Sequence, residues 1–215
     1  MKRNANVEKR GWLDLKIERF GRLFRTLGVV ECVSFLQQMV RKVNPILLRV
    51  PRVRTPLWFR AHTSDFYLLW ALFKKREGDI DLPRSPEFII DGGAHGGFSA
   101  VRFANRFPHA TILAIEPHPR NLALLRSNCA SYPKIIPLAG AIWPTSATLA
   151  IRNPDDPNID FFVGETTSQS EKTIRGYTIP ELLSLSGFDR IDLLKLDIEG
   201  AEIPLFTKGD LSWIS

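Results

Sequence analysis

The chain has 215 residues, of which 44% are hydrophobic and 24% charged, a composition typical of one globular domain with an accessory segment. Its formal net charge is +6, and the basic side chains crowd the first third of the sequence. Such a charge is compatible with nucleic acid, anionic lipid or an anionic substrate and does not choose among them. No apolar run suits a signal peptide or a membrane span, so we expect a cytoplasmic protein that is soluble or peripheral.

Cysteine usage adds a second exclusion. The two cysteines, Cys32 and Cys129, form neither a C-x-x-C pair nor any metal-binding spacing. We therefore expect a reducing compartment and no structural or catalytic metal.

Residues 11–43 are predicted to be helical, with Gly28 dividing them into two helices. Apolar residues recur there at intervals of three or four, beginning with Leu13, Ile17, Phe20, Phe24 and Leu27. The basic polar side of this segment would suit an anionic membrane surface, whereas the apolar stripe equally suits a lid or dimerising helix packed on the domain. Residues 44–60 contain three prolines among arginines, which predicts an irregular linker.

The next helix is predicted to begin at Thr63 or Ser64, whose hydroxyl groups can cap it, with Asp65 in its first turn. Gly78 is predicted to end this helix in the left-handed conformation.

The most informative stretch is 88–97, a short apolar strand followed by a glycine-rich turn. It matches acid-x-G-x-x-x-G and neither a dinucleotide fingerprint nor a P-loop. Asp91 would repel a pyrophosphate at the end of the strand but would attract an ammonium or a sulfonium group, and S-adenosylmethionine carries both. Gly93 and Gly97 allow the backbone to approach such a ligand closely.

A second apolar strand, 111–116, also ends on an acid, Glu116, after an intervening helix over 98–107. In a doubly wound sheet this acid can accept both hydroxyls of an adenosyl ribose. A helix beginning at Pro119 and a third strand, 134–139, follow. The small and apolar residues at its exit, Gly140 to Trp143, could sandwich an adenine ring, although Trp143 is equally interpreted as ordinary core.

The rest of the chain divides into an elaboration and a final strand. Residues 147–178 carry short strand-like runs and are predicted to form an inserted antiparallel element. Thr178 to Glu181 is a capping box that begins a short helix ending at Gly187. Residues 193–198 then form an apolar, buried strand.

Lys195 and Asp197 lie two residues apart on one face of this final strand. A buried lysine needs a carboxylate partner, which we predict to be Asp91 or Asp197. A purely structural ion pair is the alternative. Because the strand should end beside the glycine loop, we favour a place at the reacting centre for Lys195, Asp197 and Glu199.

The two informative stretches, with His62 to Asp65, Glu116-Pro117 and Ala141 to Trp143, resemble the FkbM family of S-adenosylmethionine-dependent methyltransferases from about Arg60 to Trp213. The resemblance implies a Rossmann-like α/β class I methyltransferase fold with a parallel central sheet. It also implies that Glu116 and Pro117 bind the ribose, that Ala141 and Ile142 line the adenine, and that Asp197 and Glu199 face the reacting centre. The residues implied to hold the methionine part of the cofactor are Asp91, Gly92, Gly93, Ala94, His95 and Gly97.

The predicted division is a basic N-terminal helical extension and linker, 1–59, and a methyltransferase domain, 60–215. The resemblance implies further strands after residue 215, so we expect a C-terminally incomplete sheet with an exposed apolar edge at 193–198. The N-terminal helices or a second copy of the chain would cover this edge. Otherwise the chain is a truncated reading frame.

The resemblance implies O-methylation of a hydroxyl on a sugar, glycan or polyketide-like metabolite. In the mechanism that we expect, Asp197 and Glu199 orient the hydroxyl and take its proton, while the Lys195 cation keeps Asp197 ionised. The competing interpretation gives both acids a structural or cofactor-positioning role. A truncated, non-catalytic cofactor-binding or interaction protein is the alternative function. A nucleic-acid methyltransferase is disfavoured because the sequence has no base-reading module, so we expect no nucleic-acid partner.

Overall fold

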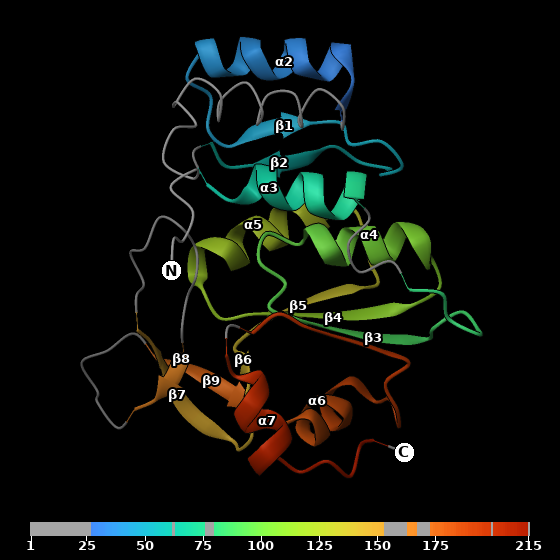
Figure 1. Cartoon of the computed structure of the whole chain (residues 1–215), viewed down its shortest axis with the longest axis vertical. Helices are drawn as coiled ribbons and strands as arrows, with labels where there is room; N and C mark the ends of the chain where they lie inside the picture. Colours follow the sequence, from blue (N-terminus) through green and yellow to red (C-terminus); the bar gives the residue numbers. More distant parts are fainter. Residues whose placement is uncertain are drawn as a thin grey trace, which may run out of the picture.

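The computed structural model describes residues 27–61, 63–75, 80–152, 163–166, 173–198 and 200–214 (Figure 1). Its helices are α2 (Val29–Val40), α3 (Asp65–Leu69), the π-helix η1 (Trp70–Lys75), α4 (Phe98–Arg106), α5 (Pro119–Cys129), α6 (Ile179–Ser186) and α7 (Glu202–Lys208). Its strands are β1 (Ile46–Leu48), β2 (Leu57–Phe59), β3 (Phe88–Gly92), β4 (Thr111–Glu116), β5 (Ile135–Ala139), β6 (Ala141–Ile142), β7 (Ala147–Ile151), β8 (Val163–Glu165), β9 (Thr173–Tyr177) and β10 (Leu193–Leu196).

The centre of the molecule is a four-stranded sheet in the order β10-β3-β4-β5, and all three neighbouring pairs are parallel. Helices α4 and α5 lie on one face of the sheet, and α6 and α7 lie on the other (Figure 1). This arrangement confirms the predicted Rossmann-like α/β fold, including the strands expected at the start of 88–97, at 111–116 and at 134–139.

Strand β3 is completely buried because both of its faces are covered. Its side chains alternate between two cores: Ile89 packs into the core beneath α4 and α5, whereas Phe88 and Ile90 pack into the core on the face of α6 and α7. A strand buried on both faces needs a continuous apolar run, and this explains the sequence pattern that predicted it.

Strand β10 differs from the expectation of a buried strand, since all four of its residues are only half-buried. The reason is its position at the edge of the described sheet, where it pairs with β3 alone. Its register places Lys195 opposite Asp91, so the two charged residues are brought together by the ladder itself.

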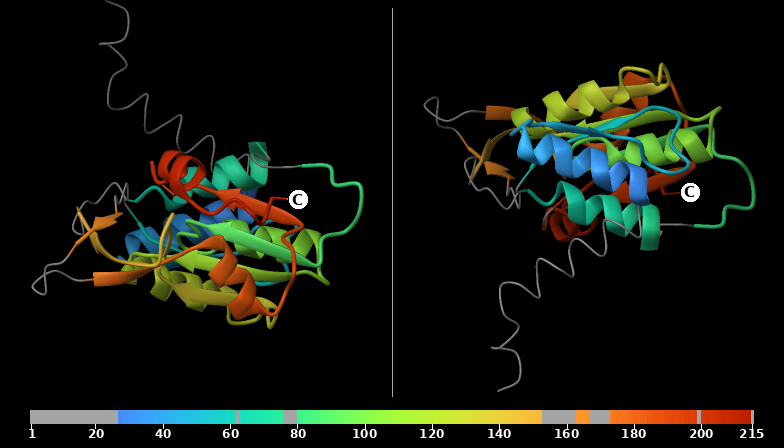
Figure 2. Two further views of the ribbon diagram at one scale, coloured as in Figure 1. Left: turned by 90° about the horizontal axis from the view of Figure 1, so that it is seen from below. Right: turned by 90° about the horizontal axis from the view of Figure 1, so that it is seen from above.

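The prediction of an irregular linker at 44–60 is wrong, because β1 and β2 form an antiparallel pair there. Pro45, Pro51 and Pro56 all lie outside the two strands, where they remove no ladder hydrogen bond. The pair lies between α2 and the helices α4 and α5 (Figure 1), and α2 is foremost when the molecule is seen from above (Figure 2, right).

Helix α2 confirms the predicted helix after Gly28, which has a φ of 82°. The predicted helix before Gly28 lies outside the described residues. Buried side chains of α2, β1 and β2 join those of α4 and α5 in one hydrophobic cluster, so this N-terminal layer shares its core with the central sheet.

The helix predicted from Thr63 begins at Asp65, whose backbone N–H donates to Thr63 Oγ1 at 3.2 Å. After five residues it continues as the π-helix η1, a change that its sequence did not predict. The predicted left-handed end at Gly78 lies outside the described residues.

A second four-stranded sheet, β6-β9-β7-β8, confirms the predicted elaboration after the third strand. β7 pairs antiparallel with β8 and β9, whereas β6 pairs parallel with β9. The capping box of α6 is also confirmed, with Thr178 and Glu181 bonded reciprocally and Gly187 in the left-handed conformation.

Among the described helices, none combines the length and the apolar character that a membrane crossing requires.

Candidate active site

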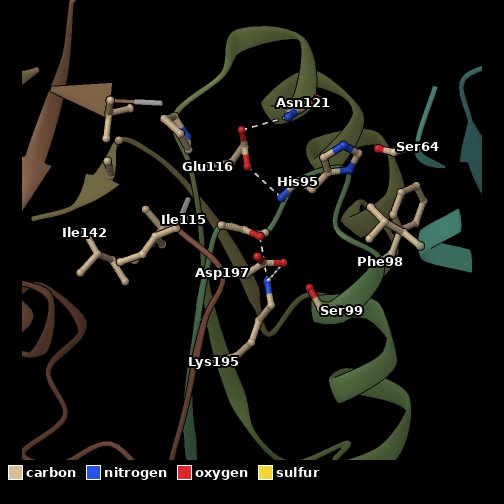
Figure 3. Close-up of a pocket in the computed structure, with 18 of the residues that line it drawn as sticks. Ser64, His95, Phe98, Ser99, Ile115, Glu116, Asn121, Ile142, Lys195 and Asp197 are labelled. Atoms are coloured by element: carbon tan, nitrogen blue, oxygen red, sulfur yellow. Dashed lines mark hydrogen bonds and ion pairs between the residues drawn. The ribbon is translucent and has the colours of Figure 1, made fainter. Parts of the chain in front are cut away.

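A cavity of about 320 Å³ opens at the carboxyl ends of the parallel strands (Figure 3). Its walls come from the glycine loop (residues 91–97), the end of β4, the exits of β5 and β10, and α3 with η1. The sequence-predicted residues that line it are Gly93, Ala94, His95, Glu116, Pro117, Ala141, Ile142, Lys195 and Asp197. Ligands of open α/β sheets bind at this edge, so the topology gathers these residues where a cofactor is expected.

Several predicted residues do not line the cavity. Asp91 is completely buried beneath the loop, and Gly92 is the last residue of β3. Gly97 is the left-handed residue that precedes α4, with a φ of 84°. Glu199 lies outside the described residues. Trp143 does not line the cavity, and its Nε1 donates to Glu165 Oε1 at 2.9 Å.

The glycine loop is held against the neighbouring strands by its backbone. The N–H groups of Gly93 and Ala94 donate to Ile115 O at 3.1 and 2.9 Å. A Cβ added to Gly93 would lie 1.9 Å from Asp197 O, and the φ of Gly93 is 71°. Glycine is therefore required here by both close approach and backbone conformation.

Lys195 links the glycine loop to β10. Its Nζ lies 3.1 Å from Asp91 Oδ1 and 3.8 Å from Asp197 Oδ2, so both predicted carboxylate partners are present. The ammonium also donates to Gly93 O at 2.8 Å and to Gly92 O at 3.3 Å. Because the shorter contacts are to the loop, Lys195 is tied more closely to Asp91 than to Asp197.

The two acids beside Lys195 lie in contrasting surroundings. Asp91 is inaccessible, and its Oδ2 accepts from the Ser99 hydroxyl. Its Oδ1 accepts no hydrogen bond within the described part of the chain, although it faces the Lys195 ammonium. The side chain of Asp197 is 62% exposed at the mouth of the cavity. Asp197 is therefore the carboxylate that an incoming molecule can reach.

Glu116 is almost inaccessible and accepts three hydrogen bonds. His118 N and Asn121 Nδ2 donate to its Oε1 at 2.9 and 3.1 Å, and His95 N donates to its Oε2 at 2.8 Å. Burial raises the pKa of this carboxyl, and the three hydrogen bonds oppose that rise. A carboxylate offers about four lone-pair sites, so one acceptor site on Oε2 is left for a ligand. This is fewer than the two hydroxyls that the sequence argument assigned to it.

A buried ion pair behind Glu116 was not predicted as part of the site. Arg60 and Asp65 form a bidentate ion pair, in which Arg60 Nη2 donates to Asp65 Oδ1 at 2.8 Å and Arg60 Nε donates to Asp65 Oδ2 at 3.1 Å. Arg60 Nη1 also donates to Asn121 Oδ1 at 2.8 Å. The closeness of Arg60 and Asp65 in sequence was a usable signal, but nothing in the sequence connects either residue with Asn121.

The His95 side chain extends from the glycine loop to this ion pair. Its Nε2 is 3.3 Å from Arg60 Nη2 and 3.8 Å from Asp65 Oδ1. Burial lowers the pKa of His95 to about 4, an effect to which the Arg60 and Lys195 cations add and which the Asp65 carboxylate opposes. The imidazole is therefore neutral near pH 7.

The far wall of the cavity is mainly apolar. Tyr67 and Leu68 of α3, Leu72 of η1 and Phe98 of α4 line it. The Ser64 hydroxyl and the His95 imidazole lie beside Phe98, and the other labelled polar groups gather around Glu116 and Lys195 (Figure 3).

Comparison with known proteins gives the family of the chain. The family model of the methyltransferase FkbM domain matches residues 91–214, more than half of the chain. The chain belongs to the FkbM methyltransferase family. It is 31% identical over 164 residues to methyltransferase sdnD of Sordaria araneosa, an alignment that covers 60% of this chain and 62% of that protein. It is 26% identical over 142 residues to methyltransferase 1 of Beauveria bassiana, covering 54% and 55% of the two chains.

The FkbM match begins at Asp91, the first residue of the glycine loop, and includes Glu116 and Lys195. Arg60 and Asp65 precede it. The chain spans less than two thirds of the length of the two curated relatives that it matches.

Proposed function

We propose that the protein is an S-adenosylmethionine-dependent O-methyltransferase that acts on a hydroxyl group of an apolar, polyketide-like metabolite. The observation that carries the proposal is the cavity at the carboxyl ends of β3 and β4, with Glu116 in its wall and Asp91 buried beneath the glycine loop. Membership of the FkbM family supports methyl transfer as the reaction.

The residues present fit this cofactor. Asp91 supplies a negative charge beneath the glycine loop, and its Oδ1 is paired with Lys195 Nζ at 3.1 Å. Glu116 Oε2 retains an acceptor site for a ribose hydroxyl. Ala141 and Ile142 supply small apolar surface for an aromatic ring. When bound, S-adenosylmethionine supplies an activated methyl group on a sulfonium ion.

The Lys195 ammonium competes with the ammonium of the cofactor for the same acceptors. Its ammonium already contacts Asp91 and the Gly93 carbonyl, which are acceptors that an amino-acid ammonium would also use. Two cations cannot share these acceptors without repulsion. We therefore expect Lys195 either to turn toward Asp197 or to pair with the carboxylate of the bound cofactor.

The apolar far wall supports a polyketide-like acceptor over a sugar or glycan. A sugar carries several hydroxyls, and each one left without a partner in a closed site would weaken binding. Tyr67, Leu68 and Leu72 instead offer a surface that favours hydrocarbon.

Asp197 is the residue that we expect to assist the acceptor. In methyl transfer the hydroxyl oxygen forms a bond to the methyl carbon as the carbon–sulfur bond breaks, and the hydroxyl proton must leave. An exposed carboxylate at the cavity mouth can orient the hydroxyl and accept this proton, typically contributing a factor of about 10² to 10⁴. Glu199 stays a predicted second carboxylate.

Calorimetric titration with S-adenosylhomocysteine tests the cofactor assignment. We expect binding by the wild-type chain and about tenfold or greater loss in Glu116→Gln, because a hydrogen bond to a charged group is removed. Glu165→Gln, outside the cavity, is the control. A folded wild-type chain that binds no S-adenosylhomocysteine would contradict the proposal.

Transfer of a labelled methyl group to a panel of hydroxylated polyketides and sugars tests the reaction. We expect transfer to apolar acceptors, with a large loss of rate in Asp197→Asn at unchanged S-adenosylhomocysteine affinity. Binding without transfer to any acceptor would instead support the alternative of a non-catalytic cofactor-binding protein.

A further inference from the structure

We propose that Arg60, held by Asp65, is a positioning residue that fixes the Glu116 carboxylate for the cofactor ribose through Asn121 and His95. The inference rests on the proposed function of Glu116. It extends the site to the segment between β2 and α3, which lies outside the residues that match the FkbM family model.

The orientation of Arg60 is strongly fixed. Its guanidinium forms the bidentate ion pair with Asp65, and its own backbone N–H donates to Asp65 Oδ2 at 2.7 Å. Asp65 is completely inaccessible, and the side chain of Arg60 is 20% exposed. A charge-assisted pair of this geometry leaves the guanidinium little rotational freedom.

Arg60 determines which way the Asn121 amide faces. A guanidinium can only donate, so its Nη1 must meet the amide oxygen, as the 2.8 Å contact with Oδ1 shows. The amide nitrogen then has to point at Glu116, where Nδ2 donates to Oε1 at 3.1 Å. If the amide turned over, two oxygens would face each other at Glu116 and the hydrogen bond would be lost.

Arg60 also determines the state of His95. Because Nη2 donates, the His95 Nε2 atom 3.3 Å away must be the acceptor, which places the ring proton on Nδ1. The backbone N–H of His95 is the donor to Glu116 Oε2. Arg60 therefore contacts two of the three residues that donate to Glu116, one at each of its carboxylate oxygens.

Other residues of this segment and of α3 line the cavity. Ser64 lies directly before Asp65 in the sequence and Tyr67 two residues after it, and both side chains line the cavity wall. A side chain with only a structural role in the N-terminal layer would not need to contact residues from the glycine loop and from α5 at once.

The first test is a double-substitution cycle measured by calorimetric titration with S-adenosylhomocysteine. We expect Arg60→Gln to weaken binding about tenfold and to cause almost no further loss in a Glu116→Gln background, because residues that act as one unit are not additive. The 2′,3′-dideoxy analogue of S-adenosylhomocysteine should bind Arg60→Gln and the wild-type chain nearly equally. Arg60→Lys should not restore binding, since lysine lacks the planar guanidinium that donates to Asp65, Asn121 and His95 at once.

The control is Arg54→Gln. Arg54 lies over the Tyr132 ring at 5.1 Å, away from Glu116, so its loss should leave S-adenosylhomocysteine affinity unchanged. Fully additive losses in Arg60→Gln and Glu116→Gln, or equal weakening of both ligands, would overturn the inference.

A second measurement needs no ligand and separates this inference from the proposed function. Carbon-detected NMR of the Glu116 carboxyl should show its titration midpoint rising in Arg60→Gln, because the carboxylate loses the oriented amide donor of Asn121. Arg54→Gln should leave the midpoint unchanged. An unmoved midpoint in Arg60→Gln would overturn the positioning role even if the wild-type chain binds S-adenosylhomocysteine. A rise in a chain that binds none would contradict the proposed function alone.

Discussion

At Gly93 the glycine loop and the exit of β10 are in direct backbone contact. A Cβ at this residue would lie 1.9 Å from Asp197 O, and a carbonyl of the peptide backbone cannot turn aside as a side chain can. One residue therefore couples the strand that carries Asp91 with the strand that carries Lys195.

Two substitutions separate the cost of a left-handed backbone from the cost of steric overlap: Gly187→Ala tests the first alone, and Gly93→Ala tests both together. Gly187 has a φ of 74° but nothing within 4 Å of an added Cβ, so its substitution should cost only the conformational penalty of about 1 kcal/mol. Gly93→Ala should cost about 1 to 3 kcal/mol more, because its Cβ also overlaps backbone. Urea unfolding measures both, and equal losses would show that the contact with β10 is relieved without cost.

His95 makes stability depend on pH. Its folded pKa of about 4 lies below the usual unfolded value of about 6.5, so the unfolded chain binds more protons between these values. The stability of the folded state is thus fully present above pH 6.5 and declines as the pH falls toward 4. From pH 7 to pH 5 the loss from this imidazole should be about 2 kcal/mol.

Urea unfolding of His95→Asn and His109→Asn at pH 7 and pH 5 checks this. Asparagine tolerates the positive φ of 50° at residue 95. The wild-type chain and the exposed-site control His109→Asn should lose about 2 kcal/mol more than His95→Asn as the pH falls. The same loss in all three proteins would rule out the buried imidazole as the cause.

Among the secondary-structure elements, the capping box of α6 offers a direct test of a sequence-predicted signal. Glu181 N donates to Thr178 Oγ1 at 3.2 Å, and Thr178 N donates to Glu181 Oε2 at 2.8 Å. We expect Thr178→Ala to lower the free energy of unfolding by about 0.5 to 2 kcal/mol. Thr207→Ala, near the end of α7, is the control and should change it by less than about 0.5 kcal/mol. Equal effects in urea unfolding would mean that the cap contributes nothing specific.

The elements that the sequence predicted correctly share strong local signals. Continuous apolar runs marked β3 and β4, and proline, threonine and glycine marked the ends of α5 and α6. The β1–β2 pair was missed because its prolines were interpreted as breaking all regular structure, whereas they only exclude the strand interiors. The apolar pattern alone overestimated the burial of β10, whereas the expectation of an exposed edge at 193–198 agrees with its half-buried residues at the edge of the described sheet.

The candidate site was predictable only where it follows strand ends. Asp91, Glu116 and Lys195 could be placed because parallel strands bring their carboxyl ends together. The contact of Arg60 with Asn121 joins residues 61 positions apart on different elements, and no periodicity or motif encodes it. Long-range side-chain hydrogen bonds of this kind depend on the packed tertiary structure.

In the whole molecule, the core crosses the predicted division at residue 59. Buried side chains from α2, β1 and β2 belong to the same hydrophobic cluster as Ile89, Phe98 and Leu125. Phe59 is at the junction, with its ring stacked on Phe98 at a centroid distance of 4.9 Å and on Phe66 at 5.6 Å. The division into 1–59 and 60–215 stays a prediction, and this shared core indicates how to test it.

Phe59→Ala should lower the stability of the whole chain in one step. Phe59 is fully inaccessible, so its truncation should cost about 3 to 5 kcal/mol, whereas Phe206→Ala, at a ring that is 45% exposed, should cost much less. In urea unfolding, far-ultraviolet circular dichroism and tryptophan fluorescence should follow one transition, and Phe59→Ala should shift both signals to the same lower midpoint. Two transitions, of which Phe59→Ala moved only one, would show instead that the N-terminal layer unfolds as an independent unit. A single shifted transition would mean that the N-terminal layer, which Arg60 directly follows, cannot detach without unfolding the sheet that carries Glu116, because both depend on the same core.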